Sequence, residues 1–211
     1  GIAIGVAAIV ALGAMAEGMR AGYIGMARGS QADLVLTRGA DIMDTSVEET
    51  VAEQLLAWPE VADVDGLLMG NVKAEDASSF FVFGYDPQGF AIEHFKIVAG
   101  QGLVRSETGQ SRGVRGKPIL LGRAAAESFG KDVGDTLHIT AGAFRIVGIY
   151  ETGDGFEEGG AVIPLEEAQM LLLQPRRVSV FYIRLRDPAE RGLPPASGEK
   201  DSPPPKLGEG S

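Results

Sequence analysis

Cysteine is absent from this chain of 211 residues, and histidine and tryptophan are scarce. Without cysteine there is no disulfide framework and no thiolate metal site. The two histidines, His94 and His138, form neither HExxH nor another spacing typical of a metal site. Gly122 before Arg123 belongs to neither a GxxxxGK(S/T) nor a GxGxxG pattern, so no phosphate cradle is expected there. The sequence therefore predicts no metal-ligating and no cofactor-binding residue.

Positive charge is also in short supply. Lys and Arg total 19 against 29 Asp and Glu, which gives a net charge of -10. This balance argues against nucleic acid as a partner, because phosphate backbones are bound by basic surfaces. It also argues against a domain that lies flat on anionic lipid. Hydrophobic residues make up 45% of the chain, which is enough to build a core and excludes a disordered protein.

The first sixteen residues, Gly1 to Ala16, carry no charge and no strongly polar side chain. At about 1.5 Å per residue, a helix of this length reaches about 24 Å, against a hydrocarbon core of about 30 Å. We interpret it as the outer end of a spanning helix whose beginning is missing, followed by an amphipathic stalk that ends at residue 28. Two alternatives stay open: a signal-peptide remnant, since residues 14–17 resemble a cleavage site, and a buried helix of a soluble protein.

Short strands, short helices and turns alternate through the rest of the chain. Strands are expected at 33–38, 61–72 with a break at Asp65-Gly66, 79–84, 118–121, 136–140, 143–150, 161–163 and 178–185. Helices are expected at 47–58, 122–129 and from Pro164 onward. An exposed polar loop or hairpin is expected at 100–117 and a flexible Pro/Gly/Ser tail at 187–211. Hairpins rather than regular βαβ alternation favour the α+β class.

Two of the expected helices have a recognisable apolar face. Ser46-Val-Glu-Glu49 predicts a capping box for the first. The residues expected on the inner faces are Val47, Val51, Leu55 and Trp58 in the first helix, and Leu165, Ala168, Leu171 and Leu172 in the last. Gly130 is expected to end the middle helix as its C-cap.

Candidate chemistry is sparse. His138 alternates with apolar neighbours in a strand, which predicts a solvent-facing side chain. His94 lies in Ile92-Glu-His-Phe95 and has an acid nearby in sequence, but no partner motif for catalysis. The acidic, glycine-rich stretch at 152–158 lacks the alternating ligands of a calcium loop and favours a sharp turn between two strands. No catalytic residue is predicted.

Several segments together resemble the first extracytoplasmic domain of MacB-type ABC transporter permeases. The early matches are the close of the apolar helix at Ala16-Glu-Gly-Met-Arg20, Ala32-Asp-Leu-Val-Leu-Thr-Arg38 and Trp58-Pro-Glu-Val61. The later matches are Ile119-Leu-Leu-Gly-Arg123, Ala126-Glu127, Phe129-Gly130, Val133-Gly-Asp135, Phe144-Arg-Ile-Val-Gly-Ile149, Glu151-Thr-Gly153, Ala161-Val-Ile-Pro-Leu165 and Ala168-Gln169. The resemblance covers residues 1–186, and its order and spacing are more specific than any single motif.

The resemblance implies a membrane subunit with four spanning helices in the inner or plasma membrane, and a domain outside it. This domain would comprise a porter-like α/β subdomain at 29–74 plus 159–186 and an inserted β-rich subdomain at 75–158. ATP hydrolysis on a partner or fused ATPase would drive the outer domains of a homo- or heterodimer, for export, efflux or lipoprotein release. A periplasmic adaptor or a cargo protein would be a further partner. The chain would then be an excised piece, continued by three more apolar segments.

Two other functions remain under consideration. A membrane-anchored binding or sensor module without an ATPase would need a ligand pocket. An anchored hydrolase built on a serine or on His94 with a carboxylate would need a triad-like grouping, which the sequence does not indicate.

Overall fold

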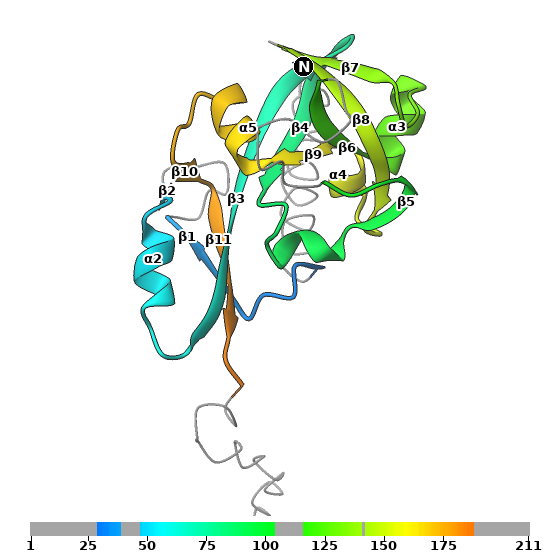
Figure 1. Ribbon diagram of the computed structural model, residues 1–211. Helices are drawn as coiled ribbons and strands as arrows, with labels where there is room; N and C mark the ends of the chain where they lie inside the picture. The colour runs from blue at the N-terminus through cyan, green and yellow to red at the C-terminus, as the bar shows by residue number, and fades with distance from the viewer. Residues whose placement is uncertain (1–28, 39–46, 104–115, 141, 188–211) are drawn as a thin grey trace, which may run out of the picture.

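The computed structural model describes residues 29–38, 47–103, 116–140 and 142–187 (Figure 1). The strands are β1 (Leu34–Thr37), β2 (Val47–Glu48), β3 (Val61–Ala74), β4 (Ala77–Tyr85), β5 (Lys96–Gly100), β6 (Lys117–Gly122), β7 (Thr136–Ile139), β8 (Gly142–Glu151), β9 (Ala161–Pro164), β10 (Arg177–Val178) and β11 (Val180–Leu185). The helices are α2 (Val51–Leu56), the 3-10 helix η1 (Ala91–His94), α3 (Arg123–Phe129), α4 (Gly155–Glu158) and α5 (Leu165–Leu171).

Nine of these strands form one mixed sheet in the order β1-β11-β3-β4-β9-β6-β8-β5, and β7 pairs with both β3 and β8. The β4–β9 and β6–β8 pairs are parallel, whereas the other pairs in the sheet are antiparallel. A separate two-stranded ladder joins β2 and β10. The expected mixture of helices and strands is confirmed, and the sheet is mixed: of its pairs, only β3–β4 and β7–β8 join strands that are consecutive in the chain.

The long strand β3 is shared by the two halves of the sheet (Figure 1). Its first half pairs with β11 as far as Leu67, and its second half pairs with β4 from Leu68 onward. The predicted break at Asp65-Gly66 is wrong. Asp65 is tolerated inside the strand because its carboxylate accepts a hydrogen bond from the Ala91 amide. Gly66 is needed because a β-carbon there would lie 2.8 Å from the Val178 side chain.

Three clusters of buried apolar side chains form the core. Alternation along β3 sends Leu68 to one face of the sheet and Leu67 and Met69 to the other. The first face includes buried residues of α3 and α5, and the second includes a residue of η1, with Phe156 of α4 packed against it. A third cluster lies beneath α2 and consists of Val47, Leu55, Val61, Val178, Phe181 and Ile183.

The first predicted helix is shorter than expected. It begins at Val51 after Thr50, which makes no side-chain capping bond. Val47 instead pairs with Val178 of β10, so its burial comes from a strand rather than from a helix. Trp58 is 60% exposed because α2 ends at Leu56, before the helical periodicity reaches it. Ser46 of the predicted capping box lies outside the described residues.

The other helices follow the sequence more closely. Gly130 is the C-cap of α3 with a φ of 60°, as expected. Ala168 on the inner face of α5 is fully buried. The turn expected at 152–158 contains the short helix α4, because Asp154 caps it. No helix in the described parts of the chain is long and apolar enough to cross a membrane. The apolar segment, the stalk, most of the loop at 100–117 and all but Asp187 of the tail lie outside the described residues.

Candidate functional site

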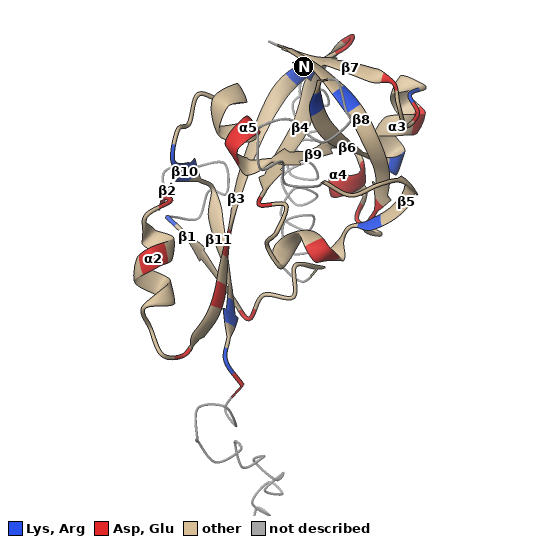
Figure 2. Ribbon diagram, viewed as in Figure 1, with Lys and Arg blue, Asp and Glu red and all other residues tan. Residues whose placement is uncertain are grey.

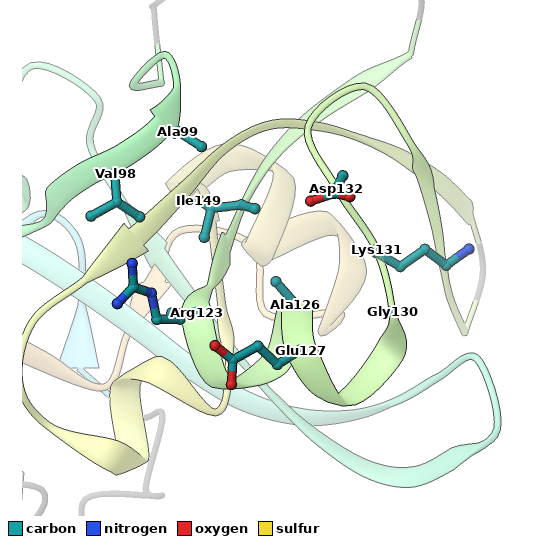
Figure 3. A pocket seen from close by; sticks show the side chains of 9 residues that line it. All are labelled: Val98, Ala99, Arg123, Ala126, Glu127, Gly130, Lys131, Asp132 and Ile149. Atoms are coloured by element: carbon teal, nitrogen blue, oxygen red, sulfur yellow. The ribbon is translucent and has the colours of Figure 1, made fainter.

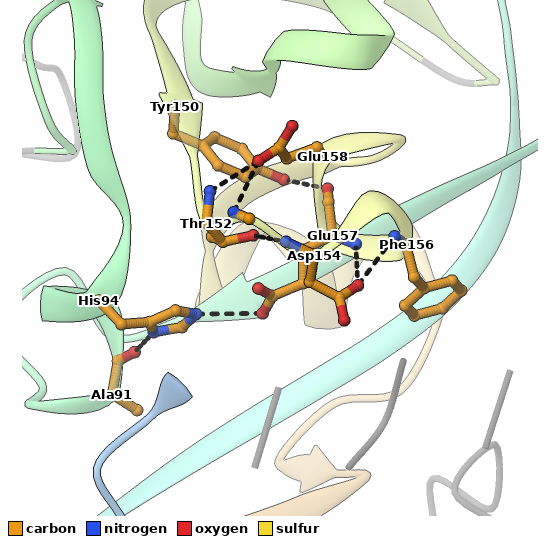
Figure 4. A network of polar contacts seen from close by, with 9 residues as sticks. Ala91, His94, Tyr150, Thr152, Asp154, Phe156, Glu157 and Glu158 are labelled. Carbon is orange, nitrogen blue, oxygen red and sulfur yellow. Dashed lines mark hydrogen bonds and ion pairs between the residues drawn. The ribbon is translucent and has the colours of Figure 1, made fainter. Parts of the chain in front are cut away.

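A network of polar contacts lies in the interior between η1 and α4 (Figure 4). The Nε2 atom of His94 lies 3.1 Å from Oε1 of Glu157, and both side chains are almost completely buried. The Nδ1 atom of the same ring lies 2.6 Å from the Ala91 carbonyl oxygen. A carbonyl oxygen only accepts, so Nδ1 carries a proton. A second proton therefore lies between Nε2 and the Glu157 carboxyl group, on one or the other.

The loop around α4 uses its remaining acidic groups on its own backbone. Asp154 Oδ1 accepts hydrogen bonds from the amides of Phe156 and Glu157, at 2.8 and 3.3 Å. Glu158 Oε1 accepts from the amides of Thr152 and Gly153, at 3.0 and 2.8 Å. In the described parts of the chain, no three His, Asp or Glu side chains are grouped as metal ligands would be. The acidic loop is therefore a capped helical turn that places Glu157 inside.

Tyrosines surround this pair. The hydroxyl of Tyr150 donates to the carbonyl oxygen of Glu157 at 2.6 Å. Phe95 lies between Tyr150 and Tyr85, with ring centroids 4.8 and 5.3 Å away and edge-to-face packing. Burial raises the pKa of Tyr85 and that of Tyr150 well above the ordinary value, and the charge of Glu157 adds to both. Both phenols therefore stay protonated, so the site has no phenolate base.

Asp65 extends the polar network to β3. Its Oδ2 atom accepts from the Ala91 amide at 2.7 Å, at the start of η1. The pKa of Asp65 is raised from 3.8 to about 6, mainly by burial; the Ala91 amide opposes this shift, and the nearby charges of Asp63 and Asp86 contribute to it. The network thus links β3, η1, α4 and β8 through hydrogen bonds made by side chains.

The geometry of His94 leaves no room for catalysis. Both ring nitrogens already have partners, and the side chain is only 7% exposed. A general base needs a free nitrogen within reach of a substrate proton. The contact with Glu157 is one that the sequence did not identify, because 63 residues separate the two. The sequence did contain one signal for α4, which carries Glu157: the Asp154-x-x-Glu157 spacing is typical of the start of a helix.

The second histidine lies on the surface, as predicted. The His138 side chain is 67% exposed, and its Nδ1 atom lies 3.4 Å from Glu75. The backbone amide of His138, followed by the ammonium group of Lys131, lowers the pKa of Glu75. This ion-pair cluster is exposed and contributes little to stability.

A shallow open cleft of about 440 Å³ lies between α3 and the edge strand β5 (Figure 3). Its two cations already have partners: Arg123 pairs with Glu151 and Lys131 with Glu75. Gly122 at the start of α3 is a close-packing residue, because its β-carbon would lie 2.2 Å from the Glu158 carbonyl oxygen. Elsewhere on the described ribbon, acidic and basic residues are interspersed (Figure 2).

The fold is that of domains that membrane transporters place outside the membrane. One similar solved structure is the periplasmic region of MacB from Actinobacillus actinomycetemcomitans, with a TM-score of 0.55, 16% identity and coverage of 79% of this chain and 83% of that one. Another is the extracellular domain of the ABC-type transporter YknZ from Gram-positive bacteria, with a TM-score of 0.51, 14% identity and coverage of 71% and 78%.

The family is given by the sequence. A family profile described as "MacB-like periplasmic core domain" matches residues 1–192. The chain belongs to this family, and the resemblance found in the sequence is confirmed. No curated protein matches the chain significantly.

Proposed function

We propose that the chain is the extracytoplasmic domain of an ABC-type transporter permease, in which ATP hydrolysis on a partner ATPase is converted into movement outside the membrane. Membership of the MacB-like periplasmic core domain family supports this proposal. The apolar segment Gly1 to Ala16 would then be the end of a spanning helix in the inner or plasma membrane. This movement would drive export, efflux or lipoprotein release.

The observation that carries the proposal is the construction of β3. One uninterrupted strand of 14 residues belongs to both halves of the sheet. A domain that transmits movement needs such a stiff connection, because rigid-body motion requires packed elements without a loose joint. The buried polar network around His94 adds a second link between β3 and the α4 side of the sheet.

We also propose a division of the domain into a porter-like part at 29–74 plus 159–186 and an inserted part at 75–158. The cluster beneath α2 supports the first part, since its members come from β2, α2, β3, β10 and β11. Strand β9 is the point where the two parts interlock, because it belongs to the first by sequence and pairs with β4 and β6 of the second.

The partners we propose are an ABC ATPase, a second permease subunit in a homo- or heterodimer, and a periplasmic adaptor or cargo protein. The experiment uses the full permease, reconstituted with its ATPase in liposomes. Replacing residues 29–187 with a flexible Gly/Ser linker is expected to leave ATP hydrolysis measurable and to abolish export. A permease that purifies from native membranes without any ATPase bound, or one that still exports without this domain, would contradict the proposal.

A membrane-anchored binding or sensor module is the second candidate, and the cleft beside α3 is the observation that favours it. A ligand that binds only the folded state raises the melting temperature with concentration. Compounds from a screen of small molecules and peptides that raise the melting temperature of the parent, but not that of a Glu127→Trp variant with a bulky ring at the cleft, would favour the sensor. Unchanged melting temperatures throughout would favour the transporter.

A further inference from the structure

The described chain enters the domain directly against His94. A β-carbon on Gly29 would lie 3.2 Å from Cδ2 of the imidazole, so the ring covers the α-carbon of Gly29. Ser30, the next residue, is 1% exposed. Gly29 is helical and Ser30 and Gln31 form a turn, with a φ of 56° at Gln31. The first turn of the described chain therefore rests on one aromatic edge, where only glycine fits without displacing it.

The other end of this short segment is fixed separately. The Asp33 amide donates to the Ile183 carbonyl oxygen at 2.9 Å, and the Asp33 carboxylate accepts from the Leu185 amide at 2.7 Å. We call residues 29–33 the N-terminal segment. It is attached to β11 at Asp33 and lies against the His94 ring at Gly29, while between these two points Ser30 is buried and Ala32 packs against the apolar cluster that includes Phe95.

Behind the ring, the contacts lead into three other elements. The imidazole is fixed to η1 by the Ala91 carbonyl and to α4 by Glu157. Asp65 of β3 holds the first amide of η1. The rings of Phe95 and Tyr85 pack on the same imidazole, with centroids 4.0 and 6.3 Å away. His94 is thus supported by its neighbours in η1, by Phe95 and Tyr85, and by Glu157, which is distant in sequence.

We propose that His94 is a positioning residue: with Glu157 it forms the seat that fixes the N-terminal segment to the domain. Given the proposed transporter function, on which this role rests, the seat carries movement of the preceding residues to η1, α4 and β3. The residues before Gly29 would turn the domain through the imidazole, not through Asp33 alone. Loss of the imidazole ring would leave the domain folded but loosely joined to the residues before Gly29.

The test is a distance measurement between two spin labels on the full chain in detergent micelles. The chain has no cysteine, so Gln31→Cys and Glu127→Cys give a unique pair, and both positions are exposed. In the parent background we expect a narrow distance distribution. In His94→Ala and Glu157→Ala we expect it to broaden at least about twofold, since the Gly29 end of the segment then loses its contact with the imidazole. Glu157→Gln keeps a hydrogen-bonding group at the same reach and is expected to stay narrow.

Two controls separate a seat from general support of the fold. Leu137→Ala removes a fully buried side chain of β7 and destabilises the domain without touching the segment, so its distribution should stay narrow. His138→Ala removes the surface histidine and should also stay narrow. An unchanged width in His94→Ala, or equal broadening in Leu137→Ala, overturns the proposal. Neither measurement needs an ATPase, so the seat can fail while the transporter function stands.

The contact can also be tested from the other side, in case His94→Ala does not fold. Gly29→Val forces a branched side chain against the imidazole. With only two histidines in the chain, their ring signals in a carbon–proton NMR spectrum are assigned by one substitution. We expect the signal of His94 to shift and that of His138 to remain. An unshifted His94 signal would overturn the contact on which the seat depends.

Discussion

His94 and Glu157 are 63 residues apart in the sequence and meet inside the domain, with Nε2 3.1 Å from Oε1. The pair joins η1 to α4, on the sheet face that holds Met69 and Phe83. Removing one partner of a buried pair leaves the other without compensation, which costs far more than the pair contributes in net stability. The value of such a pair is that it fixes one arrangement of the two elements.

His94→Ala is expected to lower the free energy of unfolding by about 3 to 5 kcal/mol, because Glu157 is left buried without its partner. The measurement is urea denaturation followed by circular dichroism. The matched control is His138→Ala, which removes the exposed member of the other His–Glu pair and should change stability by less than about 0.5 kcal/mol. Equal losses of unfolding free energy in His94→Ala and His138→Ala would show that burial does not make the His94–Glu157 pair more important for stability than the exposed pair.

The pairing of these two residues could not be predicted from the sequence. Local rules correctly placed α3, its Gly130 cap and the buried face of α5, because periodicity and capping act within a few residues. They were wrong about Val47, where pairing with β10 prevailed over a helical pattern. Local rules also missed the contact between His94 and Glu157, because the two residues are 63 positions apart and only the folded sheet brings η1 to α4.

Tyr150→Phe is expected to cost about 1 to 3 kcal/mol, because the carbonyl oxygen of Glu157 loses the hydroxyl that donates to it. Tyr85→Phe provides the comparison. Tyr85 is equally buried, but its hydroxyl interacts only with that of Tyr182, without a hydrogen bond of good geometry. Losing that hydroxyl should be neutral or slightly stabilising. Thermal unfolding of the two variants beside the parent measures the difference, and the reverse order would contradict the assignment of the network.

Asp65→Asn is expected to change how stability depends on pH. The pKa of Asp65 is about 6 in the folded protein against 3.8 ordinarily, because burial disfavours its charge. A group with a raised folded pKa binds its proton more tightly in the folded state. The buried charge of Asp65 therefore does not lower the stability of the folded protein below about pH 4. Its destabilising effect grows as the pH rises to 6 and is complete above that.

The Asn variant keeps an oxygen for the Ala91 amide and has no charge to bury. We expect it to match the parent near pH 4 and to exceed it by about 1 to 2 kcal/mol at pH 8, after solvent screening. Asp63→Asn, at an exposed position two residues earlier on β3, is the control and should give a smaller difference. Denaturation at a series of pH values measures both. A parallel shift of the Asp65→Asn curve at every pH would refute the raised pKa.

Gly122→Ala and Gly155→Ala are expected to change stability in opposite directions. At Gly122, the φ of -65° suits any residue, and alanine would restrict the unfolded chain, which favours folding by about 0.4 to 1 kcal/mol. The new β-carbon, however, would lie 2.2 Å from the backbone oxygen of Glu158, which cannot rotate away. Moving β6 from α4 also strains the bond from the Gly122 amide to the Gly160 carbonyl.

The steric cost at Gly122, about 1 to 3 kcal/mol, is therefore expected to exceed the gain from restricting the unfolded chain. The melting temperature of Gly122→Ala should fall by several degrees. At Gly155 no atom lies within 4 Å of the new β-carbon, and the residue opens α4, so alanine should raise the melting temperature. Calorimetry on the two variants decides the matter. A rise in both would mean that β6 and α4 separate easily, and that the close approach between Gly122 and the Glu158 backbone is not a constraint on the fold.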